Sequence, residues 1–218
     1  MKRGFTLIEF SVFVICVSTV AILVLPGLMK DHAKRVLTKQ LQMTHVTLQS
    51  GMKSYLKDMK VKKLYYTKAF NKNRSPKDLT AFLTFLTEEI NPVKVCTTAN
   101  NDMDTCKGSE YKRLNGAVED TFGGEVCAIL KTGATVCFNR MAFERQTPYL
   151  FIDVNGPNKG PNVWGRDAFR LIYNNYGDVA ESFMATPLPI NQAAHCQDNQ
   201  FGGGCFNRIT GTNWSMDY

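Results

Sequence analysis

Six cysteines lie in the polar part of this 218-residue chain, in three pairs whose members are about ten residues apart. Thiols at this spacing can form disulfides or bind a metal. An even number of cysteines downstream of an apolar segment is typical of disulfides in an oxidising compartment. Because short loops close at low entropic cost, we predict that neighbours pair, as Cys96–Cys106, Cys127–Cys137 and Cys196–Cys205. Zinc is the alternative, but the chain has no C-x2-C knuckle and only His195 lies beside a cysteine.

A polar loop offers a second kind of chemistry. Residues 153–169 have the sequence DVNGPNKGPNVWGRDAF. Calcium binds carboxylate, amide and carbonyl oxygens in forgiving geometry, so Asp153, Asn155 and Asp167 are candidate ligands. The loop does not match an EF-hand, and the alternative is a purely structural loop, since Asp, Asn, Gly and Pro cap their own backbone in tight turns. Trp164 either plugs the sheet or is an exposed contact.

Glu9 stands at the start of a long apolar segment. From Phe10 to Met29 twenty residues carry no charge, which is the length that crosses the hydrocarbon core of a bilayer. A carboxylate at this place is costly and normally marks a functional pairing, whereas a glutamate that stays hydrated near the headgroups is the alternative. Pro26 lies inside the same segment, and we expect it to kink or locally unwind a helix.

The chain lacks the motifs of common catalysts. It contains no H-E-x-x-H, no G-x-S-x-G and no P-loop. Its three histidines are scattered along the sequence: His32, His45 and His195. We therefore expect that the protein is not an enzyme.

The formal charge of the chain is +7, and the excess is local. Between Lys30 and Lys68 ten Lys and Arg residues stand against Asp31 and Asp58. Such a basic segment can attract nucleic-acid phosphates or anionic lipid. The alternative is a solvated helix face that meets acidic surfaces on neighbouring copies.

The spacing of apolar residues predicts the elements that position these groups. A stripe at intervals of three and four predicts one helix from Phe5 to about Asp58, apolar all round at first and amphipathic later. Residues 75–78 have the signature of a second helix start, and Asn91-Pro92 ends that helix. We then predict an antiparallel sheet of about four strands from the segments 125–130, 134–139, 149–154 and 168–173, with a short strand at Val179. The fold class is α+β, a long N-terminal helix packed on a disulfide-stapled sheet.

The first residues carry a more specific signal. A short basic leader is followed by GFTLIE, from Gly4 to Glu9, and then by the apolar segment with Pro26. This N-terminus resembles that of the type IV pilin and type II secretion pseudopilin family. The resemblance is close over about the first thirty residues, and the loop at 153–169 is similar to a recurrent segment in the heads of minor pilins.

The resemblance implies how the N-terminus is used. A prepilin peptidase would cut between Gly4 and Phe5 and methylate the new amine of Phe5. In a filament Glu9 of one subunit would then neutralise the amine of its neighbour and set the axial register. Pro26 would let the helix extend as the subunit passes from bilayer to filament.

The resemblance also implies an organisation and a function. Residues 1–4 would be a leader peptide, 5–29 a transmembrane and filament-core helix, and 30–218 a periplasmic or extracellular head. With its basic start in the cytoplasm, the chain would cross the inner membrane once and then enter a pilus or a periplasmic pseudopilus. The first hypothesis is a minor pilin, and the alternatives are a pseudopilin or a pilus-borne adhesin or DNA-binding pilin. Its partners would be other pilin subunits, the prepilin peptidase and the inner-membrane assembly platform, with DNA or a host surface as candidate ligands.

Overall fold

A computed structural model of the chain describes residues 6–70, 76–119, 122–139, 148–181, 196 and 203–218. The chain divides into two compact units, Met1–Val36 and Leu37–Tyr218. The helices are α1 (Leu7–Asp58), η1 (Leu64–Tyr66), α2 (Pro76–Phe85), η2 (Leu86–Ile90), η3 (Thr98–Asn100), η4 (Met103–Thr105) and α4 (Cys205–Gly211). The strands are β1 (Lys94–Thr97), β2 (Val126–Ile129), β3 (Thr135–Asn139), β4 (Tyr149–Asp153), β5 (Ala168–Tyr173) and β6 (Val179–Glu181).

The predicted α+β architecture is confirmed, with a long N-terminal helix, an antiparallel sheet and disulfides. Helix α1 has 52 residues and begins at Leu7, while Phe5, the predicted first residue, lies outside the described part of the chain. Helical structure continues through Pro26 without a break. Because proline leaves one carbonyl without its donor, this position is still the weakest point of the backbone hydrogen bonding in the apolar segment.

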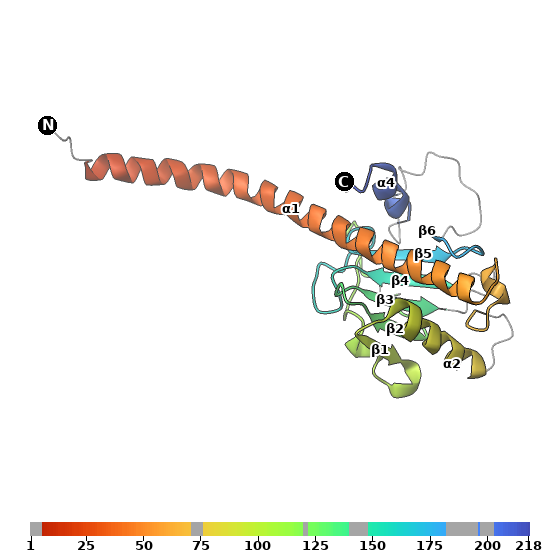
Figure 1. The fold of residues 1–218 in the computed structure, drawn as a ribbon. Helices are drawn as coiled ribbons and strands as arrows, with labels where there is room; N and C mark the ends of the chain where they lie inside the picture. The colour runs from red at the N-terminus through yellow and green to blue at the C-terminus, as the bar shows by residue number, and fades with distance from the viewer. Residues whose placement is uncertain (1–5, 71–75, 120–121, 140–147, 182–195, 197–202) are drawn as a thin grey trace. The chain divides into compact units, whose positions relative to one another are not determined.

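The sheet has six antiparallel strands in the order β1-β2-β3-β4-β5-β6, so each strand pairs with its neighbours in sequence (Figure 1). The predicted number of about four strands is therefore wrong. Segments 125–130 to 168–173 and Val179 correspond to β2–β6, and the missed strand is β1. Strand β1 is four residues long, follows directly after a helix and pairs only with β2, so its own sequence carries little alternation from which to predict it.

One face of the sheet is covered by helices. Figure 1 shows the C-terminal part of α1 and helix α2 lying across the sheet, and their apolar side chains form one buried cluster with alternate strand residues. Leu41, Leu48 and Met52 of α1 are completely buried. The hydroxyl of the buried Tyr173 in β5 donates a hydrogen bond to the Leu48 carbonyl at 3.0 Å. The 3.6-residue period of α1 and the two-residue period of the strands therefore meet in a single core.

The opposite face is covered by loops. Side chains of Tyr111, Phe122 and Trp164 pack over the disulfide cysteines and Phe151. The rings of Tyr111 and Phe122 are stacked, with centroids 4.3 Å apart. Because both faces of the sheet are buried, the strands carry apolar residues at nearly every position.

Gly51 is the point of closest approach between α1 and the segment after α2. A Cβ atom at Gly51 would lie 2.5 Å from Ile90 Cδ1 and 3.0 Å from the Glu89 carbonyl oxygen. The neighbouring segment is the π-helical turn η2, which ends at Asn91 in a left-handed conformation. A glycine inside α1 costs intrinsic helix stability, and here it makes room for that turn.

We expect Gly51→Val to lower the free energy of unfolding by about 1–3 kcal/mol, because the added atoms would push η2 away from α1. The measurement is chemical denaturation of the full chain in detergent. Ser54→Val is the matched control, since Ser54 lies one turn further along α1 and is exposed. Because valine has a higher helix propensity than glycine, a Gly51→Val variant that is as stable as the wild type, or that loses no more than Ser54→Val, would contradict the packing argument.

Candidate functional site

The N-terminal part of α1 is apolar and uncovered. An 18-residue window of the helix has a mean hydropathy of 2.6, and none of that window is buried. Length and composition make α1 the one helix in the described chain that could cross a membrane. Large side chains are exposed all round, among them Leu7, Phe10, Phe13 and Leu25. Such a surface requires lipid or other apolar helices as its surroundings.

Glu9 takes part in a capping box at the start of this helix. Its Oε2 atom accepts hydrogen bonds from the backbone N–H and from the hydroxyl of Thr6, both at 2.9 Å. In return the Glu9 N–H donates to Thr6 Oγ1 at 3.3 Å. This reciprocal pattern satisfies two backbone donors at a helix N-terminus, and Thr6 and Glu9 could have predicted it from the spacing T-x-x-E. Gly4 and Phe5, the predicted processing residues, lie outside the described part of the chain.

Three disulfides join the cysteine neighbours that the spacing predicts: Cys96–Cys106, Cys127–Cys137 and Cys196–Cys205. Two of the bonds come together in one row across the sheet. Cys96, Cys127 and Cys137 are direct register partners in β1, β2 and β3, and Phe151 continues the row in β4. Cys96–Cys106 therefore connects the edge strand β1 to the residue after η4, and Cys127–Cys137 joins β2 to β3. Cys16 is exposed on α1 and unpaired.

The structure brings Asp153 and Asp167 into one buried loop network. Asp153 accepts hydrogen bonds from the Tyr111 hydroxyl at 2.8 Å and from the Gly156 N–H at 3.0 Å. Asp167 accepts from the backbone N–H groups of Asn162 and Val163, at 2.8 and 2.6 Å. Each of the four carboxylate oxygens thus has a protein donor.

Asn155, the third candidate calcium ligand, also holds the loop. Its amide donates to the Gly160 carbonyl at 2.9 Å. Among the residues that the structure describes, no three His, Cys, Asp or Glu side chains lie together as a metal-binding group. These hydrogen bonds give Asp153, Asn155 and Asp167 structural roles in the loop, while the Asn155 Oδ1 atom is buried and accepts no hydrogen bond from the described part of the chain.

Burial sets the ionisation of these carboxyls. Burial raises the pKa of Asp153 to about 6. The hydrogen bond from Tyr111 lowers this pKa, and the nearby charge of Asp167 raises it further. Burial likewise raises the pKa of Asp167 above its ordinary value, and the N–H groups of Val163 and Asn162 oppose it. Two like charges in one desolvated loop therefore favour a proton on Asp153 below about pH 6.

Trp164 is a plug and not an exposed contact. It is completely buried, and its ring N–H donates to the Glu119 carbonyl at 3.0 Å. The loop at 153–167 thereby holds the segment around Glu119 over the sheet. Sequence alone could not choose between the two roles, because the partner of Trp164 lies 45 residues away.

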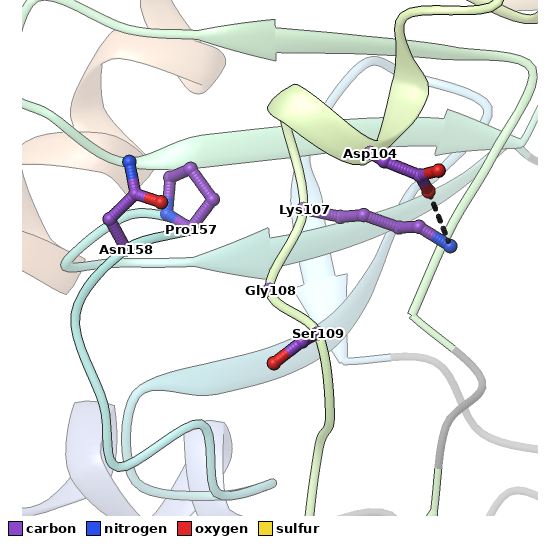
Figure 2. A pocket seen from close by; sticks show the side chains of 6 residues that line it. All are labelled: Asp104, Lys107, Gly108, Ser109, Pro157 and Asn158. Carbon is purple, nitrogen blue, oxygen red and sulfur yellow. Dashed lines mark ion pairs between the residues drawn. The ribbon is translucent and has the colours of Figure 1, made fainter.

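A small surface pocket opens beside this loop (Figure 2). Its volume is about 330 Å³, and it is lined by Asp104, Lys107, Gly108, Ser109, Pro157 and Asn158. Figure 2 shows Lys107 reaching toward Asp104, on the other side of the pocket from Asn158, and the two charged groups are 3.5 Å apart. The pocket is polar and can hold a small polar group. The ion pair in its lining is solvent-exposed, since 94% of the Asp104 side chain is accessible.

A buried glutamate that the sequence reading missed fastens the C-terminal helix. Glu181, at the end of β6, accepts hydrogen bonds from the N–H groups of Gly204 and Asn207 at the start of α4. Burial raises its pKa to about 7, and those N–H groups act against the rise. On the other side of α4, Phe206 and Trp214 pack against His45 of α1, with ring centroids 5.5 and 5.4 Å away.

No protein-family model, no curated protein and no solved structure matches this chain. The pilin resemblance therefore rests on the residues of the sequence itself.

The raised pKa of Asp153 predicts how stability depends on pH. The folded protein keeps this proton up to about pH 6, whereas the unfolded chain releases it near 3.8. The contribution is complete below pH 3.8 and is lost as the pH rises through 6, so we expect the free energy of unfolding to fall by about 2–3 kcal/mol over this window. Denaturation at several pH values measures it. Asp153→Asn should remove this part of the slope and leave the part due to Glu181, whose pKa is also raised. Asp104→Asn, at an exposed carboxyl, should leave the whole slope unchanged.

The loop network also predicts the response to calcium. Asp153 and Asp167 are completely buried and their oxygens accept protein hydrogen bonds that an ion would have to displace. We therefore expect the same melting temperature in excess calcium and in a chelator. The measurement is a thermal melt of the full chain in detergent. A rise in calcium that disappears in Asp167→Asn would contradict the structural role and establish a metal site.

Proposed function

We propose that this chain is a pilin-like structural subunit, anchored in the inner membrane by α1 and assembled through α1 into a filament. The observation that carries the proposal is the pairing, in one helix, of an uncovered apolar half and a half that is buried on the head. An apolar helix that nothing covers is not soluble in water, and this includes the aqueous periplasm. Lipid before assembly and neighbouring helices after assembly would cover it in turn.

The N-terminal motif supports the same proposal. The resemblance at GFTLIE implies cleavage after Gly4 and a free, methylated amine on Phe5. In the single chain, the Glu9 carboxylate is held at the helix start by hydrogen bonds from Thr6. A carboxylate at this place can accept both the local cap and the amine of a neighbouring subunit, since each oxygen has two lone pairs.

The three disulfides favour a specialised subunit over the abundant shaft protein. They tie the loops of the head to its sheet and to α4, which stabilises a head with long connections. We therefore propose a minor pilin as the first assignment. A pseudopilin of a type II secretion system would use the same anchor and the same assembly mechanism, and the filament in which the subunit is found distinguishes the two.

The test separates the charge of Glu9 from its capping role. Glu9→Gln keeps a capping group that can accept from Thr6 but removes the negative charge. We expect this variant to stay in the membrane and to be absent from purified filaments, as Glu9→Ala should be. Immunoblots of membrane and sheared-filament fractions measure both, and the mature N-terminus by mass spectrometry should lack residues 1–4.

Thr6→Ser is the matched control, because serine preserves the capping hydroxyl, and it should assemble normally. If Glu9→Gln enters filaments as well as the wild type, the charge pairing is wrong and only the cap matters. If the unmodified chain keeps residues 1–4, or is never found in a filament, the proposed function itself is wrong.

A further inference from the structure

A basic surface with an exposed aromatic ring lies where α1 ends. We define the Lys–Tyr surface as Lys57, Lys60, Lys62, Lys63, Tyr66 and Lys68, from the last turn of α1 through η1. Four of its lysines are exposed and Lys63 is half-buried. Asp58 is the one acidic residue between residues 57 and 68.

Buried neighbours fix the orientation of this surface. Leu64, Thr67 and Ala69 are each about 1% exposed and face the core. The Leu64 N–H donates to the Asn175 carbonyl at 2.8 Å, and the Ala69 N–H donates to the Tyr55 hydroxyl at 3.3 Å. Since buried residues hold the backbone between the lysines, the positive charges project from an ordered backbone, and little backbone entropy is lost when they meet a ligand.

Helix capping explains only part of the charge. The Val61 N–H bonds the Leu56 carbonyl, and Lys60 adopts a left-handed conformation with φ 54°, which together close the end of α1. Cations are favourable at a helix C-terminus, which accounts for two lysines, at positions 57 and 60. The lysines at 62, 63 and 68 lie beyond the helix and gain nothing from it.

The lysines of this surface are not used inside the head. Among the ion pairs of the described residues none involves any of the five. Lys53, one turn earlier in α1, differs, because it lies 2.6 Å from Asp178. The positive charge on the Lys–Tyr surface therefore remains available to a partner.

Aromatic rings stand among these charges. Tyr66 is 60% exposed, and its ring centroid lies 4.0 Å from that of Tyr65. Tyr176, which is 59% exposed, belongs to the turn that the Leu64–Asn175 hydrogen bond holds beside η1. Exposed tyrosines beside lysines are typical of surfaces on which bases stack while the backbone phosphates are neutralised.

We propose that the Lys–Tyr surface binds single-stranded nucleic acid, with the lysines on backbone phosphates and Tyr66 stacked on a base. This inference stands apart from the proposed filament role and does not depend on it. A single strand is favoured over a duplex because only unpaired bases offer a face to a tyrosine ring.

Two other partners fit this surface less well. A membrane surface requires several apolar side chains that insert between lipids. Here Leu64 and Phe70 are buried, and Met59, 41% exposed, is the one large aliphatic side chain of residues 57–70 that is exposed. An acidic face on a second copy would require uncommitted carboxylates. Five of the described acidic side chains already pair with Lys or Arg: Asp104, Asp178, Glu110, Glu119 and Asp217.

The test is fluorescence anisotropy with the full-length chain in nonionic detergent and a labelled oligothymidylate of about 20 nucleotides. We expect the logarithm of the binding constant to fall linearly with the logarithm of the salt concentration, with a slope of about −3 to −4 for five lysine–phosphate contacts. The same strand in a duplex should bind more weakly, because its bases are stacked on each other.

Three sets of variants separate the local charge of the Lys–Tyr surface, the stacking of a base on Tyr66 and the net charge of the whole protein. At about 50 mM salt, Lys62→Glu/Lys63→Glu should weaken binding at least about tenfold and reduce the salt slope by about 1.4. Lys131→Glu/Lys159→Glu changes the net charge equally, at exposed lysines elsewhere on the head, and should change affinity less than about twofold. Tyr66→Ala should weaken binding about tenfold, whereas Tyr66→Phe, which keeps the ring, should bind like the wild type.

Several outcomes would overturn the proposal. The surface does not bind nucleic acid if the oligonucleotide fails to bind at low salt, or if the control pair of lysine variants weakens it as much as the surface pair. Displacement by phosphatidylglycerol mixed into the micelles, at equal charge, would assign the surface to lipid headgroups. If polyglutamate at equal charge displaces the oligonucleotide, the surface binds anions in general and not nucleic acid in particular. None of these results bears on whether the chain enters filaments.

Discussion

The head depends on the burial of one face of α1 against the sheet. Leu41, Leu48 and Met52 supply this face, and Tyr173 adds a buried hydrogen bond from β5 to the helix backbone. Glycines allow the close contact, since Gly177 lies with φ 78° where a side chain would meet Met52. A helix anchored in this way has a fixed register against the strands, and it forms one core with α2 and α4 on this face of the sheet.

Local patterns made much of this fold predictable. The apolar stripe of α1, the cysteine spacing and the strand segments after residue 124 depend on residues close in sequence, and the structure contains all of them. Strand β1 was missed because it is specified by its register with β2, where Cys96 lies opposite Cys127. The number of strands therefore required the pairing partner and not only the segment itself.

The candidate site could be predicted by residue type but not by role. Asp153 and Asp167 are both suited to calcium, yet their roles follow from partners such as Tyr111, which lies 42 residues from Asp153. Glu181 has no sequence signature at all, because the helix start that it caps begins 23 residues later. Long-range hydrogen bonds of this kind decide whether a carboxylate is a ligand or part of the framework, and spacing along the chain does not encode them.

The three disulfides have a consequence for how the head matures. Each bond joins a cysteine to the next cysteine along the head, at a sequence separation of 9 or 10. A polypeptide that enters an oxidising compartment from its N-terminal side presents each cysteine and its correct partner before the next pair arrives. Native bonds can then form in order as the chain emerges, without a misbridged intermediate that an isomerase would have to rearrange. The order of the cysteines along the sequence therefore favours native pairing in a chain that crosses a membrane from its N-terminal side.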